Sequence, residues 1–205
     1  MLVAGCAPGV PVRPISVPPD GRVQVSGELT VIEVDIPPML RRHAFEPKKG
    51  FVVFRNELAP LHTVVATAEI YRAADQLVAQ KAVAGKGDEQ VLAMYVEATE
   101  PLEREIAGRP GNLLRSYEHV GGTRPRLQSE GVACDERRLV AEDRGVPGQG
   151  GKPFLLHNRL YTCIAPQSHL PVTLSWSERY PVGSAELSDG FEQGADTYFD
   201  SLTFQ

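Results

Sequence analysis

The side chains that could carry acid–base chemistry or hold a metal are spread thinly along the 205-residue chain. Its histidines stand in five separate segments, and no two of them have the H-E-x-x-H spacing by which one helix presents two zinc ligands. They are His43, His62, His119, His157 and His169. No G-x-S-x-G elbow seats a serine nucleophile. We therefore expect no catalytic motif, no metal and no cofactor.

Charged residues form two groups that need an interpretation. Glu100 and Glu103 share one face of an expected helix and could offer paired carboxylates. The alternative, which we favour, is a solvated face on which Arg104 and Arg109 form ion pairs with these carboxylates. Arg137-Arg138 is a short basic cluster with acidic neighbours, which we interpret as solvated loop charge. The formal net charge of −5 gives no basic footprint for nucleic acid, so we expect no nucleic-acid partner.

The segment Leu2-Val3-Ala4-Gly5-Cys6 resembles the end of a bacterial lipoprotein signal peptide. In that family the peptidase cuts before a cysteine whose sulfur carries diacylglycerol, and small residues precede the cut. The resemblance implies that Cys6 is the lipid-bearing N-terminus and that 1–5 are the remnant of the signal. The basic and apolar parts of a signal peptide are missing, so we expect an upstream start codon that encodes them. The alternative is an ordinary free or buried cysteine.

Residues 6–21 are rich in proline and form the expected tether of this anchor. Proline fixes φ and removes a donor, so the segment should be extended and span about 3 Å per residue. In enterobacterial lipoproteins an aspartate after the lipidated cysteine favours retention in the inner membrane, and here that residue is Ala7. The resemblance therefore implies a lipid anchor in the outer membrane, with the protein facing the periplasm.

If Cys6 is lipidated, Cys134 and Cys163 remain as an even pair in an oxidising compartment. Disulfides persist there, and closing a loop of roughly 30 residues would stabilise the fold by about 3 to 4 kcal/mol. The alternatives are a metal pair or a catalytic thiol, but neither cysteine lies in a C-x-x-C spacing or has a histidine at a ligand spacing. We therefore expect a structural disulfide.

Period-two alternation and short apolar runs indicate β-strands on both sides of one long helix. The strand segments are 22–36, 51–54, 63–72, 113–120, 154–164 and 171–180, of which the last two should pair antiparallel. Apolar residues at three- and four-residue spacing over 88–106 predict the helix, which Pro101 should kink or restart. Asp189 and Glu192 resemble a capping box that opens a C-terminal helix.

This order of elements predicts an α+β fold, in which an antiparallel β-sheet is covered by the long central helix and the C-terminal helix. Residues 22–205 would form a single α+β domain. The end of the chain, a hairpin followed by a helix that closes in Tyr198-Phe199-Asp200-Ser201-Leu202-Thr203-Phe204, is similar to the tail of Mog1/PsbP-like periplasmic domains.

Three aromatic residues late in the chain are the candidate binding surface. Trp176, Tyr180 and Tyr161 lie near one another in the expected hairpin and could form a recognition patch. The alternation of Trp176 with small polar residues favours a place in the core instead.

Two functions follow from these observations. The first is a lipid-anchored, periplasm-facing binding module with a protein partner, such as an immunity protein against a type VI secretion effector or an accessory of envelope assembly. The second is an envelope enzyme whose site is assembled from dispersed histidines and carboxylates, since catalytic groups need not be neighbours in sequence. His157 and His169, for example, would approach each other only if the pairing of their strands allowed it.

Overall fold

The computed structural model describes residues 18–40, 50–71, 84–107, 112–146, 148–183 and 186–205. The lipoprotein-like motif with Cys6 and residues 6–17 of the tether lie outside the described residues. The strands are β1 (Arg22–Ser26), β2 (Val31–Asp35), β3 (Phe51–Ala59), β4 (His62–Ile70), β5 (Asn112–Gly121), β6 (Cys134–Asp143), β7 (Phe154–Ile164), β8 (Pro171–Pro181) and β9 (Thr203–Phe204). The helices are the 3-10 turn η1 (Pro38–Leu40), α2 (Asp88–Ala107), α3 (Pro125–Ser129) and α4 (Phe191–Asp200).

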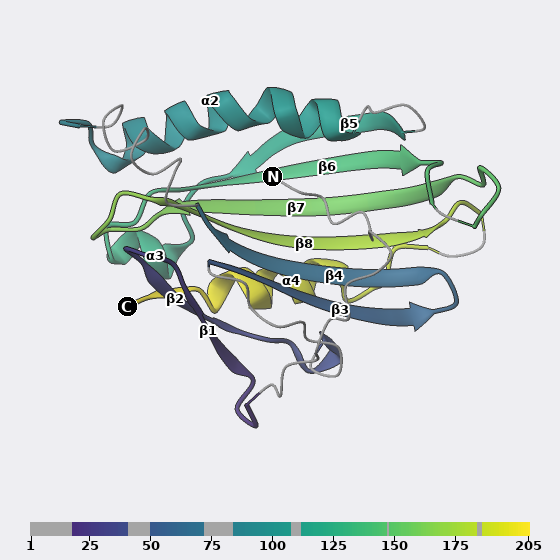
Figure 1. The fold of residues 1–205 in the computed structure, drawn as a ribbon, viewed down its shortest axis with the longest axis horizontal. Coiled ribbons are helices and arrows are strands. Elements are labelled where there is room, and N and C mark those ends of the chain that lie inside the picture. Colours follow the sequence, from purple (N-terminus) through teal and green to yellow (C-terminus); the bar gives the residue numbers. More distant parts are fainter. Residues whose placement is uncertain (1–17, 41–49, 72–83, 108–111, 147, 184–185) are drawn as a thin grey trace.

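The predicted α+β class is confirmed, with one addition. A six-stranded antiparallel sheet in the order β3-β4-β8-β7-β6-β5 carries the fold, and a second sheet of β1, β2 and β9 lies beside it (Figure 1). The sequence predicted one sheet. It missed the second one because β9 is only two residues long and pairs with β2 across the whole length of the chain.

The main sheet has α2 on one face and α4 on the other. Helix α2 packs against β5, β6 and β7, whereas α4 packs against β8 and also reaches β2. The alternation of β6 explains this division, because Arg137 points toward α2 and its neighbour Arg138 points toward α4. Figure 1 shows α2 along one edge of the sheet, over the strands that it contacts.

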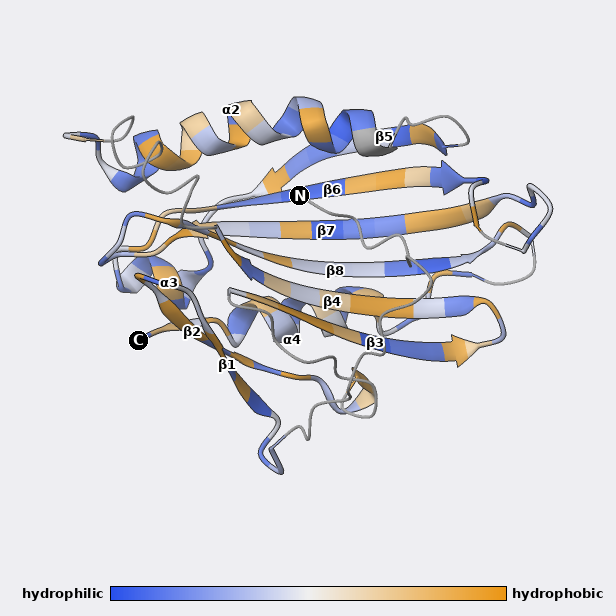
Figure 2. Cartoon of the chain, in the orientation of Figure 1, coloured by the Kyte–Doolittle hydropathy of each residue, from blue (hydrophilic) through white to orange (hydrophobic). Residues whose placement is uncertain are grey.

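The largest hydrophobic cluster lies on the α4 face and joins both sheets. Alternate residues of each strand supply it, such as Val64 of β4 and Val34 of β2, together with the inner side of α4. Figure 2 shows the matching hydrophobic segments on the strands. Two smaller clusters lie on the α2 face, one at the start of α2 and one under β5. The core is therefore thick beneath α4 and thin beneath α2.

The two long helices differ from the expectation in detail. Helix α2 continues through Pro101 and does not restart there. Helix α4 begins after Gly190, and no side chain caps it, so the predicted capping box does not form. The carboxylate of Glu192 binds Arg138 at 2.8 Å and Arg159 at 2.7 Å, which keeps it away from the free amides of the helix. Neither of these helices, nor any other in the described ranges, is long and apolar enough to cross a membrane.

Candidate functional site

The three aromatic residues proposed as a binding surface are buried, so that hypothesis is wrong for the folded chain. Trp176 and Tyr161 have no exposed surface and Tyr180 is 5% exposed. They lie on the face of β7 and β8 that α4 covers, where Trp176 packs against Tyr198 and Tyr161 stacks on Phe199. The place in the core that the alternation of Trp176 favoured is therefore confirmed.

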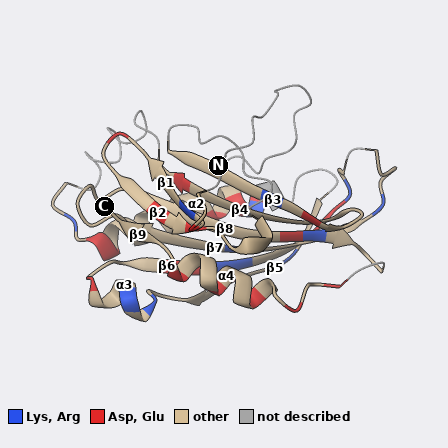
Figure 3. Ribbon diagram, turned by 90° about the horizontal axis from the view of Figure 1, so that it is seen from below, with Lys and Arg blue, Asp and Glu red and all other residues tan. Residues whose placement is uncertain are grey.

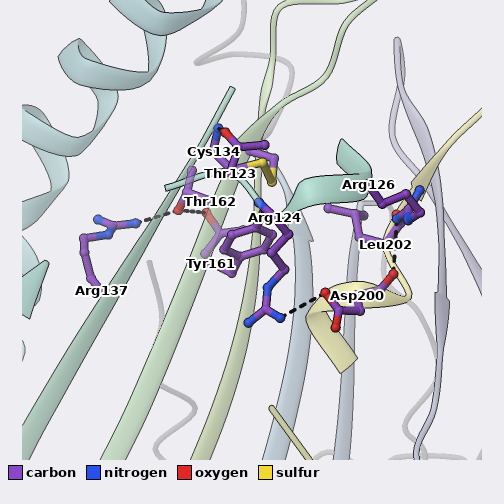
Figure 4. Close-up of a disulfide and its surroundings, with 11 residues drawn as sticks. Thr123, Arg124, Arg126, Cys134, Arg137, Tyr161, Thr162, Asp200 and Leu202 are labelled. Carbon is purple, nitrogen blue, oxygen red and sulfur yellow. Dashed lines mark hydrogen bonds and ion pairs between the residues drawn. A yellow bond between two sulfur atoms is a disulfide. The ribbon is translucent and has the colours of Figure 1, made fainter. Parts of the chain in front are cut away.

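Cys134 and Cys163 form the expected disulfide. The two residues are direct partners across the antiparallel pair of β6 and β7, and both are buried in the main cluster. Figure 4 shows the bond beside Tyr161, whose hydroxyl accepts a hydrogen bond from the backbone N–H of Arg124 at 3.0 Å. The guanidinium of Arg124 then reaches Asp200 of α4 at 2.9 Å. The disulfide therefore lies where the hairpin, the loop before α3 and the end of α4 meet.

The carboxylates of α2 follow the sequence prediction only in part. Glu100 pairs with Arg104 at 2.8 Å on the exposed face, and the pKa of Glu100 is lowered by hydrogen bonds from Arg104 and then from His119. Glu103 is buried, so the prediction that it lies on a solvated face is wrong. Its partner is Arg137, at 2.8 Å, and it also accepts a hydrogen bond from the Tyr117 hydroxyl at 2.6 Å. Arg109 lies outside the described residues.

The basic pair Arg137-Arg138 belongs to a strand, so its assignment as solvated loop charge is also wrong. Arg137 is completely buried under α2, where it donates to Glu103 and, at 2.5 Å, to the hydroxyl of Thr162. Burial of a guanidinium costs free energy unless its charge is matched, and here Glu103 and Asp135 match the charge, while Nε makes no hydrogen bond with any described residue. The second half of α2 is thus attached to the sheet through charge and hydroxyl groups, while Val91 and Leu92 attach its first half through apolar contact.

A second network of ion pairs lies on the opposite face, between α4 and the sheet, around the buried guanidinium of Arg159. Arg159 is 3% exposed and binds Glu136 and Asp196, each at 2.7 Å. Arg124 binds the same oxygen of Asp196, Oδ1, at 2.9 Å. Burial raises the pKa of Asp196, but the hydrogen bonds from these two guanidinium groups outweigh it and lower the pKa overall. Figure 3 shows the acidic residues of α4 close to basic positions on the strands.

Glu178 of β8 is a buried acidic residue that the sequence did not single out. Its carboxylate lies 2.6 Å from His62 Nε2 and accepts hydrogen bonds from both the backbone N–H and the hydroxyl of Ser188, each at 2.7 Å. Because Ser188 donates to the carboxylate and not to a histidine, the three residues do not form a serine–histidine–acid triad. The cluster fixes the segment that enters α4 against the sheet.

His157 and His169, which could have met across paired strands, do not meet. His157 lies within β7 opposite Glu178 and beside Tyr180, and burial lowers its pKa. His169 lies in the turn after β7, where its Nδ1 is 2.6 Å from Asp88 at the start of α2. Within the described part of the chain, no three histidine, cysteine or acidic side chains are arranged as metal ligands.

A hollow of about 520 Å³ opens beside His169. Its lining comes from three loops that the fold brings together: Leu29, Ala84, Gly85, Lys86, Gln167, Ser168 and His169. His169 has a φ of 55°, which is unusual for a residue other than glycine, and Asp88 fixes the orientation of its ring. If the Nδ1–H donates to this carboxylate, Nε2 stays available as a proton acceptor. Ser168 also lines the hollow, but its hydroxyl is already in contact with the hydroxyl of Thr30.

The outer face of α2 is the other surface that the core does not use. Met94 is 39% exposed and Leu102 is 52% exposed, and Ala98 and Pro101 lie between them along the same side of the helix. Positions four residues apart stack on one face of an α-helix, so these residues form one apolar stripe, which we call the α2 stripe. Bands of hydrophobic residues are visible on α2 in Figure 2.

Comparison with known proteins gives a distant structural similarity. No protein-family model matches the chain, and no curated protein matches it. The chain is similar to LpqN, whose crystal structure is described as that of a protein involved in cell envelope biogenesis of Mycobacterium tuberculosis. The two proteins share 14% sequence identity, the similarity covers 90% of each chain, and the TM-score is 0.43. A similarity of this size carries no conclusion about function, so the lipid anchor and the envelope location stay predictions.

Proposed function

We propose that this protein is a lipid-anchored binding module of the bacterial cell envelope, held to the outer membrane through Cys6 and facing the periplasm. The single observation that supports a binding role is the α2 stripe, because an apolar strip that the core leaves exposed along one side of a helix is typical of protein contact surfaces. The partner of such a module is a protein.

Two features support the location. The motif Val3-Ala4-Gly5-Cys6 supplies the lipid anchor, and the disulfide between Cys134 and Cys163 requires a compartment in which disulfides persist. Both features belong to proteins that act outside the reducing cytosol. Neither one depends on the partner.

The location is tested by labelling cells with radioactive palmitate. The protein expressed from its own gene should incorporate the label, and Cys6→Ser should abolish both the incorporation and the membrane fraction of the protein. Equal labelling of wild type and Cys6→Ser would contradict the anchor. The binding role is tested separately, by solubilising envelopes in detergent and recovering the lipidated chain. A partner in near-equal amount is expected, and its absence at several detergent strengths would contradict a binding module.

Two versions of the partner fit this role, and one assay separates them. If the chain is an immunity protein, its deletion should make cells sensitive to a periplasm-acting effector of a neighbouring type VI secretion system. If the chain is an accessory of envelope assembly, its deletion should weaken the envelope in the absence of any competitor. The genes on either side give the first indication, since an immunity protein is encoded beside its effector.

A second candidate function, an envelope enzyme, is favoured by one observation. The pair of Asp88 and His169 borders the hollow, and a carboxylate on Nδ1 orients an imidazole as a general base. The test is hydrolysis of p-nitrophenyl esters and phosphates by the purified protein. Turnover that disappears in both His169→Ala and Asp88→Asn would favour the enzyme, and turnover unchanged by either substitution would reject this site.

A further inference from the structure

The α2 stripe is exposed because the other side of α2 is already committed to the sheet. Val91 and Leu92 are buried near the start of the helix, and Glu103 is buried near its end. A helix attached at both ends of its inner face cannot rotate to bury Met94 and Leu102 as well. The outer apolar side chains therefore stay in solvent while the protein keeps this fold.

Two carboxylates lie beside the stripe, and no Lys or Arg in the described part of the chain forms an ion pair with either of them. Glu97 is three residues from Met94, and Glu105 is three residues from Leu102, so each lies next to an apolar position on the helix surface. Both are exposed, and among the described residues neither forms an ion pair. Arg104, the Lys or Arg residue of α2 itself, pairs with Glu100 and lies over the ring of Tyr117.

We propose that the α2 stripe docks an amphipathic helix of another protein, whose apolar side carries lysine or arginine at its margins. This proposal rests on the proposed binding role and names the chemistry of the partner. Met94 and Leu102 lie about 12 Å apart along the axis, which matches the apolar side of a two- to three-turn helix. The partner's cations then lie opposite Glu97 and Glu105.

The carboxylates of Glu97 and Glu105 disfavour two other binding partners of the α2 stripe, which are a second copy of this chain and an anionic lipid surface. In a second copy of this chain, the stripe would bring Glu97 and Glu105 close to the equivalent carboxylates, and like charges repel across an interface. An anionic lipid surface would meet the same negative margin, since the binding of helices to such surfaces depends on basic residues. A basic protein segment satisfies both the apolar stripe and its charges.

The test uses site-specific photo-crosslinking in cells that express the full lipidated chain. The photoreactive residue p-benzoylphenylalanine is placed at position 102 and, as a matched control, at position 113, because Leu102 and Leu113 are both 52% exposed. Position 113 lies on the edge strand β5. We expect one discrete protein adduct from position 102 and none from position 113. The crosslinked peptide of the partner should contain lysine or arginine next to apolar residues.

Charge reversal then tests the role of the two carboxylates beside the α2 stripe. Glu97→Lys together with Glu105→Lys should reduce the adduct from position 102 by about tenfold, while Glu186→Lys, an exposed reversal outside α2, should leave it unchanged. Circular dichroism checks that each variant is folded.

Several results would overturn the proposal: adducts between two copies of the chain, adducts to lipid, equal labelling from positions 102 and 113, or a crosslinked segment that is acidic. Failure of the envelope function gives a different pattern. If Cys6→Ser leaves the membrane fraction unchanged while position 102 still captures a basic segment, the anchor is wrong and the docking surface stands.

Discussion

The guanidinium of Arg137 lies 2.8 Å from the carboxylate of Glu103, and both side chains are at most 3% exposed. This ion pair joins β6, the neighbour of the edge strand β5, to the second half of α2. Removing one partner of a buried pair leaves an uncompensated charge, whereas replacing both by apolar groups restores a matched interface.

We therefore predict that Glu103→Leu lowers the free energy of unfolding by about 3 to 5 kcal/mol. The double variant Glu103→Leu with Arg137→Met should recover most of that loss. Urea unfolding of the four proteins in a double-mutant cycle measures both effects. Glu100→Gln, at the exposed pair with Arg104, is the control and should cost less than about 1 kcal/mol. A loss at position 100 as large as that at 103 would contradict a special role for the buried pair.

The disulfide gives a second prediction. Replacing Cys134 and Cys163 by alanine should lower the free energy of unfolding by about 3 to 4 kcal/mol, because a loop of 29 residues is no longer closed in the unfolded chain. Guanidinium unfolding of the wild type with and without dithiothreitol checks this. The reduced wild type should unfold at nearly the same midpoint as the alanine variant. If dithiothreitol does not change the midpoint of the wild type, the disulfide is not formed.

Gly194 of α4 should be intolerant of alanine, although alanine normally stabilises a helix interior by up to about 1 kcal/mol over glycine. A Cβ at this position would lie 2.6 Å from Cζ2 of the Trp176 ring, which is closer than the packing allows. We expect Gly194→Ala to destabilise the fold by about 1 to 3 kcal/mol, by overpacking. Thermal unfolding is a sufficient test. Gly190→Ala is the control, since a Cβ there meets no atom within 4 Å.

Leu61 occupies the tip of the β3–β4 hairpin with a φ of 66°. This left-handed conformation is costly for leucine and easier for asparagine. Because Leu61 is 41% exposed, little burial is lost on substitution, and we expect Leu61→Asn to raise the free energy of unfolding by roughly 0.5 to 1 kcal/mol. The same change at Leu58, which lies within strand β3, should lower it. Urea midpoints that move in the same direction would contradict the strain at the turn.

The network around Asp196 predicts a loss of stability in acid. The pKa of Asp196 is lowered in the folded protein by Arg124 and Arg159, against the effect of burial. A folded-state pKa below the unfolded value of about 3.9 adds stability above that pH, and the added stability is lost as the pH falls through the folded pKa. Asp196→Asn should thus be less stable than the wild type at pH 7, with the difference shrinking below about pH 4. Urea titrations at pH 7, 4 and 3 test the trend. A difference that grows in acid would contradict it.

Periodicity was enough to predict most of the elements. Residues 154–164 and 171–180 alternate in polarity or form apolar runs, and both became strands that pair antiparallel as expected. The spacing over 88–106 became α2. These predictions succeed because a strand or an amphipathic helix needs its hydrophobic pattern before any partner is chosen. The cysteine pair succeeded for a related reason, since only two cysteines are left once Cys6 is set aside.

Strand β6 was missed because its charges hide its alternation. The run Asp135-Glu136-Arg137-Arg138 looks like a solvated loop, yet successive side chains point to opposite faces of the sheet. Arg137 forms an ion pair with Glu103 of α2, and Glu136 forms an ion pair with Arg159 under α4. Each of these charges can be buried because the fold places beside it a residue of opposite charge that is distant in sequence.

The sequence by itself therefore determined the class of fold, the long helix and the cysteine pair, because those depend on local pattern and residue type. The tertiary structure decided which charges are buried and which apolar residues stay exposed. Trp176 is covered because α4 packs on its face of the sheet, and Leu102 is left in solvent because α2 is attached by its other side. Burial depends on which face of an element receives a neighbour, and that choice is made only when all the elements pack together.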